Sequence, residues 1–174
     1  MVAAGLLSGV GFLPALSAQS GRDFSGTWIL DSSSPSGPEI PRTLTVSQTL
    51  ATTNVRGEPI PPAFRSISIT RTTANGTTAD THTIGVEGGI IGGIVPGPGG
   101  PIATSTSTQF SVLWENESLV FERRTYTGSA PETGVWASSR EVWSFDADGR
   151  LRLVISTRGS ADDPRTSVLV YSRP

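Results

Sequence analysis

The stretch REVWSFDADGRLRLVIST (residues 140–157) decides the fold class of this chain. Apolar and polar side chains alternate on both sides of Asp148-Gly149, a dipeptide that is typical of a tight β-hairpin turn. An alternation of period two places every second side chain on the same face of a strand. The stretch therefore predicts two antiparallel strands with one apolar face and one polar face.

The same alternation recurs along most of the chain. The other alternating runs are RTLTVSQT (42–49), FRSISITRT (64–72), DTHTIGV (80–86), STQFSVLWE (107–115), SLVFERRTY (118–126) and RTSVLVYSR (165–173). Asn75-Gly76 and the segment 115–118 read as further hairpin turns between these runs. A meander of this length has to curl, and closure removes its unpaired edges. We predict an all-β fold, a single antiparallel up-and-down barrel of roughly 8–10 strands, with a β-sandwich as the alternative.

The amino-acid composition excludes several kinds of chemistry. The chain has 174 residues, which suggests one domain, and it contains no cysteine. Disulfides, thiol catalysis and cysteine-ligated metals are therefore excluded. All 13 basic residues are arginine, so neither a P-loop lysine nor a Schiff-base lysine can form. His82 is the single histidine, and no serine lies in a Gly-x-Ser-x-Gly motif. We expect no cofactor, no metal site and no catalytic residue.

The charges are interspersed and the net charge is −2. A nucleic-acid interface needs basic residues concentrated on one face, and no such concentration is visible. We expect no nucleic-acid partner, and the sequence leaves any protein partner open.

Residues 1–18 resemble a secretory signal peptide. The segment has an apolar run, GLLSGVGFLPAL (5–16), followed by small residues suited to cleavage after Ala18. It lacks a basic start, which suggests a true start upstream of Met1, and a retained anchor is the alternative interpretation. We expect residues 19–174 to form a mature secreted or periplasmic domain with no membrane span.

The segment EGGIIGGIVPGPGGP (87–101) breaks the alternation. Its glycines and prolines disfavour both a helix and a central strand. We predict a connection between strands, with a flap over the barrel mouth as the alternative. In the second case Ile90, Ile91, Ile94 and Val95 would form its apolar contact surface.

Three segments resemble a known family. DFSGTWILDSSSP (23–35), SREVWSFDADGRLRLVISTRG (139–159) and TSVLVYSR (166–173) are similar to the first strand, the C-terminal hairpin and the last strand of small secreted lipocalin-like proteins of bacteria. The resemblance covers the two ends of the chain and not residues 50–110. It implies a calycin-type barrel. Most members of that family have no known activity.

The resemblance also implies a structural role for three residues at the barrel base. In lipocalins a tryptophan of the first strand closes the base, and a basic side chain from the last strand packs across it. Gly26 and Trp28 match the first-strand motif, and Arg173 matches the basic residue, with Arg165 as the alternative. A guanidinium over an indole is stabilised by a cation–π interaction.

A second group of residues forms the candidate ligand site. Aromatic residues on the predicted apolar faces could line a cavity, as could the polar residues that share those faces. The candidates are His82, Phe110, Trp114, Phe121, Glu141 and Trp143. For His82 the simpler interpretation is a core histidine, and for Glu141 it is an ion pair with Arg140 or Arg152. The run Glu122-Arg123-Arg124 reads as a solvated outer face with cross-strand pairs.

Three functions fit these observations. The first is a secreted lipocalin-like barrel that binds a small hydrophobic ligand in its interior. The second is a structural or interaction module of the cell envelope without a small-molecule function. The third is a calycin-like isomerase or hydratase, which needs His82 or Glu141 to face a cavity beside another polar group. We expect that the protein is not an enzyme.

Overall fold

The computed structural model describes residues 21–85, 87–91, 95–97, 100–128, 135–159 and 163–174. The predicted signal peptide lies outside the described residues. Within them the chain consists of strands joined by turns. The strands are β1 (Gly26–Leu30), β2 (Thr43–Thr53), β3 (Pro59–Thr73), β4 (Gly76–Thr83), β5 (Glu87–Ile91), β6 (Val95–Gly97), β7 (Gly100–Glu115), β8 (Ser118–Gly128), β9 (Val135–Phe145), β10 (Leu151–Gly159) and β11 (Arg165–Ser172).

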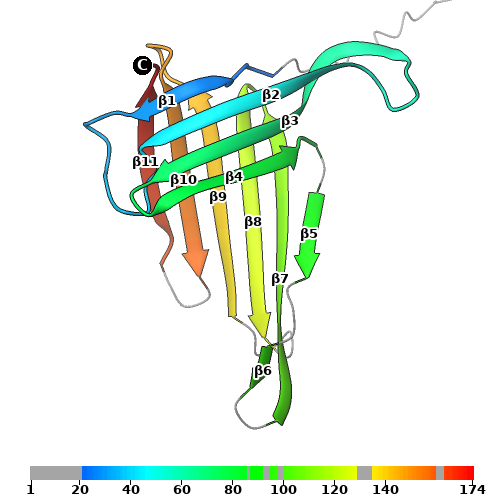
Figure 1. Ribbon diagram of the computed structural model, residues 1–174, viewed down its shortest axis with the longest axis vertical. Coiled ribbons are helices and arrows are strands. Elements are labelled where there is room, and N and C mark those ends of the chain that lie inside the picture. The colour runs from blue at the N-terminus through cyan, green and yellow to red at the C-terminus, as the bar shows by residue number, and fades with distance from the viewer. Residues whose placement is uncertain (1–20, 86, 92–94, 98–99, 129–134, 160–162) are drawn as a thin grey trace, which may run out of the picture.

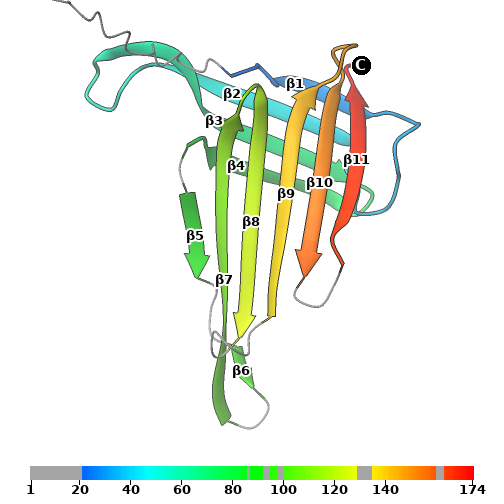
Figure 2. The ribbon, with the colours of Figure 1, turned by 180° about the vertical axis from the view of Figure 1, so that it is seen from behind.

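The strands form one antiparallel, nearly closed barrel, which confirms the predicted fold class. Their order is β4-β3-β2-β1-β11-β10-β9-β8-β7-β5, so almost every strand lies beside its neighbour in the sequence. The first and last strands also pair, with Leu30 opposite Tyr171. Figure 1 shows the result: β1–β4 cross in front of the upper part of β7–β11. Figure 2 shows the same two layers from behind, with the lower parts of β7–β9 extending beyond the first layer.

The predicted turns occur where the sequence placed them. Asn75-Gly76 joins β3 to β4, and Asp148-Gly149 joins β9 to β10. Gly76 and Gly149 have φ angles of 141° and 76°. Such angles strain residues that have a Cβ, so glycine suits both positions. Asn116 in the turn between β7 and β8 has a φ of 55°, which asparagine tolerates better than most residues.

The seam of the barrel lies between β4 and β7. β4 pairs with β3 alone, and the chain then bends at Gly85. The Gly85 N–H donates a hydrogen bond of 2.7 Å to the carbonyl of Val112 on β7. The next residues form β5, which pairs with the lower part of β7 from Glu87 opposite Ser111 to Ile91 opposite Ser107. One bent segment therefore contacts both layers.

The glycine-rich segment was predicted as a connection, and this prediction is wrong for part of it. The backbones of β5 and β6 pair with β7. Both strands lie at an edge, where a strand needs a partner on one side only, so the weak strand propensity of glycine is tolerated there. The flap interpretation concerned side chains that lie outside those the structure describes.

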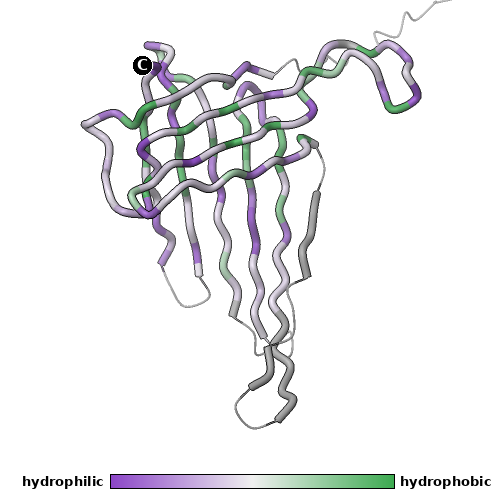
Figure 3. Tube along the Cα trace, viewed as in Figure 1, coloured by the Kyte–Doolittle hydropathy of each residue, from purple (hydrophilic) through white to green (hydrophobic). Residues whose placement is uncertain are grey.

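The hydrophobic core lies where the two layers cross. Among the residues whose burial the structure describes, fifteen hydrophobic ones are buried, including Phe24, Trp28, Trp143 and Tyr171, which are exposed by 1% or less. In Figure 3 the hydrophobic segments gather in this upper region, while the lower parts of β7–β11 are mostly pale or purple. The upper part of the interior is therefore a packed core, and the lower part of the inner face is more polar.

The barrel base brings together the three residues that the resemblance indicated. The Arg173 Cζ lies 4.7 Å from the centre of the Trp28 ring. The Trp28 indole donates to the Phe24 carbonyl at 2.9 Å, and the Arg173 guanidinium donates to the Ser25 carbonyl at 3.3 Å. A Cβ at Gly26 would lie 3.4 Å from the Arg173 Nη1, so glycine leaves room for the guanidinium. Arg165, the alternative, begins β11 at the other end of that strand.

Candidate functional site

A cavity of about 280 Å³ opens where the first layer ends and β7–β9 continue beyond it. We call it the mouth cavity. Its lining comes from five strands that the meander brings together: Arg71 of β3, Asp80 and His82 of β4, Phe110, Ser111 and Val112 of β7, Phe121, Glu122 and Arg123 of β8, and Ser139 and Glu141 of β9. Four of the six predicted ligand residues are in this set: His82, Phe110, Phe121 and Glu141.

The wall on one side of the mouth cavity is aromatic. The His82 ring makes edge contacts with Phe110 and Phe121, whose centroids lie 5.6 and 5.8 Å away. Phe121 in turn packs on Trp143 at 5.2 Å, which connects this wall to the closed core. An apolar part of a ligand would find its contacts here.

Neither of the other two predicted ligand residues lines the mouth cavity: Trp143 lies in the closed core, and the partly buried Trp114 packs against that core. Trp143 is fully buried. Trp114 stacks on Phe24 at 6.0 Å, and its buried indole nitrogen has no hydrogen-bond partner within the described part of the chain. The packing of β1 and its preceding segment against β7–β9 fills the space that these tryptophans could otherwise have lined. The prediction that they contact a ligand is therefore not supported by their positions.

The lining of the mouth cavity also includes a charged network centred on Arg71. Its guanidinium lies 3.4 Å from Asp80 Oδ2 and 3.5 Å from Glu141 Oε2. The other Glu141 oxygen accepts a 2.6 Å hydrogen bond from the buried Trp143 indole. The side chains of Arg71 and Glu141 are about one-fifth exposed, so water screens this pair less than a surface pair. The network holds Glu141 from two sides.

This network corrects the simpler interpretation of Glu141 as the partner of Arg140 or Arg152. Arg140 pairs instead with Glu115 and Glu122. Successive side chains of a strand point to opposite faces, so neighbours in the sequence are poor partners. The run 122–124 does not form one solvated outer face, because Glu122 and Arg123 both line the mouth cavity, although Glu122 does make a cross-strand pair with Arg140.

His82 is held in a neutral form by its surroundings. Burial lowers the pKa of its imidazole below the ordinary value of 6.5, and the positive charges of Arg71 and Arg123 act in the same direction. The negative charges of Asp80 and Glu141 oppose this effect. The His82 Nδ1 is buried and has no hydrogen-bond partner among the described residues, which also disfavours a protonated ring.

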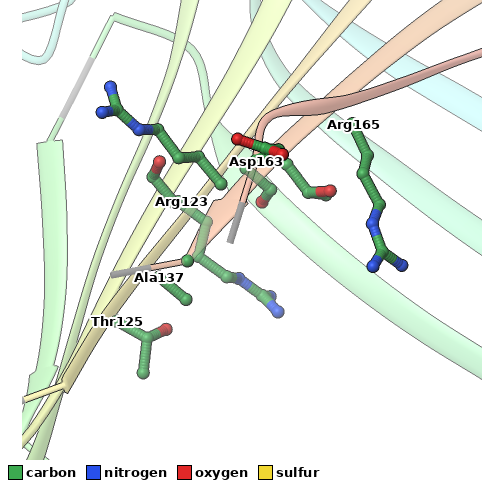
Figure 4. A pocket seen from close by; sticks show the side chains of 10 residues that line it. Arg123, Thr125, Ala137, Asp163 and Arg165 are labelled. Carbon is green, nitrogen blue, oxygen red and sulfur yellow. The ribbon is translucent and has the colours of Figure 1, made fainter. Parts of the chain in front are cut away.

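A second hollow, of about 320 Å³, continues along the inner face below the mouth cavity. We call it the arginine hollow. It shares Arg123 and Ser139 with the mouth cavity and is also lined by Thr125, Ala137, Ser138, Thr157, Arg158, Gly159, Asp163 and Arg165. Figure 4 shows Thr125 and Ala137 on one side of the hollow and Arg165 on the other. The two hollows together form one continuous surface.

Sequence reasoning did not include seven of the residues that line the mouth cavity: Arg71, Asp80, Ser111, Val112, Glu122, Arg123 and Ser139. Each lies on an alternating run, but their relation depends on which strands cross. For Arg71 one signal was available in the sequence: it lies on the same face of its strand as Ile67 and Ile69, which are buried. This spacing indicates that Arg71 points to the interior.

No group of three or more metal-ligating side chains occurs among the described residues. The same part of the chain contains no helix long and apolar enough to cross a membrane. No protein-family model matches the chain, and no curated protein or solved structure shows significant similarity to it. The geometry of the mouth cavity is therefore the basis on which a function is inferred.

Proposed function

We propose that the mouth cavity binds a small amphipathic molecule. The observation that carries this proposal is the pairing of an aromatic wall, Phe110 and Phe121, with a charged wall centred on Arg71 around one open space. Ligand sites combine an apolar lining with a few placed polar groups in this manner. The volume of about 280 Å³ suits a small ligand.

This proposal modifies the expectation of a purely hydrophobic ligand. The apolar interior is occupied by core side chains, whereas the open space has charged residues on its walls. A ligand with no polar group would leave these charges facing an apolar surface, which is costly. An amphipathic ligand avoids that cost.

The geometry favours binding over acid–base catalysis. Asp80 and Glu141 both lie beside Arg71, and Glu141 also accepts the Trp143 indole hydrogen bond. Carboxylates fixed in this manner form a binding wall. An isomerase or hydratase would need one of them to be released toward the substrate.

A polarity-sensitive, uncharged fluorescent probe, N-phenyl-1-naphthylamine, tests the proposal. We expect its fluorescence to rise on binding to the wild-type protein. The variant Ser139→Phe should weaken binding at least tenfold, because Ser139 lines the mouth cavity and a phenyl ring would fill it. The matched control is Ser144→Phe, since Ser144 lies on the same strand and lines neither the mouth cavity nor the hollow next to it.

Two results would contradict the proposed site. One is a wild-type protein that gives no fluorescence change with the probe. The other is equal binding by the Ser139→Phe and Ser144→Phe variants, which would place the probe elsewhere. Circular dichroism of both variants would establish that they remain folded.

We further propose that the protein is exported and is related to the lipocalin-like proteins of bacteria. Support comes from the apolar segment at residues 1–18 and from the barrel architecture. N-terminal sequencing of the protein from its natural host tests export. A mature chain that begins after Ala18 supports it, and an intact Met1 contradicts it.

A further inference from the structure

The arginine hollow differs from the mouth cavity in its charge. In the mouth cavity Arg71 has two carboxylate neighbours, Asp80 and Glu141. In the arginine hollow neither Arg123 nor Arg165 has a carboxylate within 4.0 Å among the described residues. Within the described part of the chain, neither guanidinium group is therefore neutralised by an ion pair.

The remaining charges of the arginine hollow define the anion that would fit. Asp163 also lines it, so two arginines face one carboxylate. Arg158 also lines the hollow and keeps its charge, although its guanidinium lies over the Trp136 ring, with the Cζ 5.6 Å from the ring centre. With Arg158 counted, the lining has a formal surplus of positive charge, so the hollow suits an anion.

Hydroxyl groups next to the arginines add suitable donors. Thr125 and Ser139 line the same hollow. A carboxylate has two oxygens and accepts several hydrogen bonds, and a guanidinium matches its planar shape. Arginine and hydroxyl donors together are a common environment for a bound carboxylate.

Arg123 connects the two spaces because it lines both of them. A ligand whose apolar part contacts Phe110 and Phe121 could therefore place a polar end beside Arg123 without leaving the surface. Along the inner face, Arg123 lies between the aromatic wall and Arg165.

We propose that Arg123 and Arg165 bind the carboxylate of a small monocarboxylate whose aromatic or aliphatic body occupies the mouth cavity. This inference rests on the proposed function and names the chemical class of its ligand. It assigns the arginine hollow as the subsite that selects acids over uncharged molecules of the same shape.

Isothermal titration calorimetry with two ligands of nearly the same shape tests the inference. The ligands are 2-naphthoate, which is charged, and 2-naphthamide, which is not. We expect the wild-type protein to bind 2-naphthoate about tenfold to a hundredfold more tightly, the effect of a hydrogen bond to a charged group. The preference should decrease at high salt, because both arginines are exposed.

The variants Arg123→Gln and Arg165→Gln should each reduce this preference at least several-fold while leaving the affinity for 2-naphthamide nearly unchanged. Arg124→Gln is the matched control. Arg124 is the next residue on the same strand, and it does not line the arginine hollow. The hollow that it does line adjoins the arginine hollow through Thr125, Ala137, Ser138 and Arg158. Its loss removes the same charge but no lining residue of the arginine hollow.

Each other outcome has a defined meaning. Equal affinity for both ligands overturns the inference and leaves the proposed binding site in place. A preference for 2-naphthoate that survives in both arginine variants, or falls equally in Arg124→Gln, also overturns it. If neither ligand binds while N-phenyl-1-naphthylamine does, the inference is wrong and the proposed function stands. If none of the three binds, both are contradicted.

Discussion

His82 reports on the state of the mouth cavity because it is the single histidine of the chain. Burial lowers its pKa below 6.5. The folded protein therefore binds this proton less readily than the unfolded chain does. The stability that follows from the neutral ring is present above pH 6.5 and is lost as the pH falls below 6.5 through the window between the two pKa values.

We predict that the imidazole of His82 titrates with a midpoint below 6.5 in the folded protein. NMR observation of its ring protons measures this midpoint without ambiguity of assignment, since no other histidine is present. The same chain unfolded in urea is the control and should titrate near 6.5. A folded midpoint at or above 6.5 would mean that Asp80 and Glu141 outweigh burial.

For individual residues, the sequence predicted which residue types line the cavity better than it predicted which side chains contact one another. It placed His82, Phe110, Phe121 and Glu141 among the candidates, because all four share faces with apolar residues. It did not identify Arg71 or Arg123. The reason is that a charged side chain on an alternating run looks the same in the sequence whether it faces solvent or a cavity lined by another layer.

Strand β9 carries the side chain that links the core to the mouth cavity. Glu141 accepts the hydrogen bond of the buried Trp143 indole and lies beside Arg71 across the interior. Both side chains of the ion pair are largely shielded from water. Removing the carboxylate therefore leaves a buried donor without an acceptor and weakens the network around Arg71.

We predict that Glu141→Leu lowers the free energy of unfolding by about 1–3 kcal/mol, the usual cost of an unsatisfied buried polar group. Urea denaturation measures the change. The control is Glu115→Leu, which removes an exposed partner of Arg140 and should cost less than about 1 kcal/mol. Equal effects of the two substitutions would show that the Glu141 contacts do not stabilise the fold.

The glycine-rich segment 87–101 was predicted as a connection, but part of it forms strands. Its composition argued against a central strand, and β5 is indeed at an edge of the sheet. The local sequence does not indicate that β7 has a free edge with which β5 can pair. The pairing of β5 depends on the position of β7 and not on the propensities of β5 itself.

The two layers of the molecule are linked at Gly85, two residues after the end of β4, where the chain turns toward β7. The Gly85 N–H binds the Val112 carbonyl, and its φ of 83° lies in the left-handed region. Proline can supply neither the N–H nor this angle. Alanine keeps the N–H, so an alanine variant is destabilised only by the unfavourable φ angle.

We predict that Gly85→Pro costs about 2–4 kcal/mol of stability and that Gly85→Ala costs about 1–2 kcal/mol. Urea denaturation gives both values. Hydrogen exchange should show that β4 loses protection selectively in the proline variant. If the two variants have the same stability, the bond between Gly85 and Val112 contributes nothing to closure.

The sequence by itself determined the all-β class, the hairpin turns and the antiparallel meander. These features depend on side-chain alternation and on local backbone preferences, which a short stretch such as residues 140–157 contains in full. The tertiary structure alone decided which charged residues face one another. Arg71, Glu141 and Arg123 come from three strands, and their proximity depends on how the two layers cross. The packed core, the mouth cavity and the arginine hollow follow from that crossing.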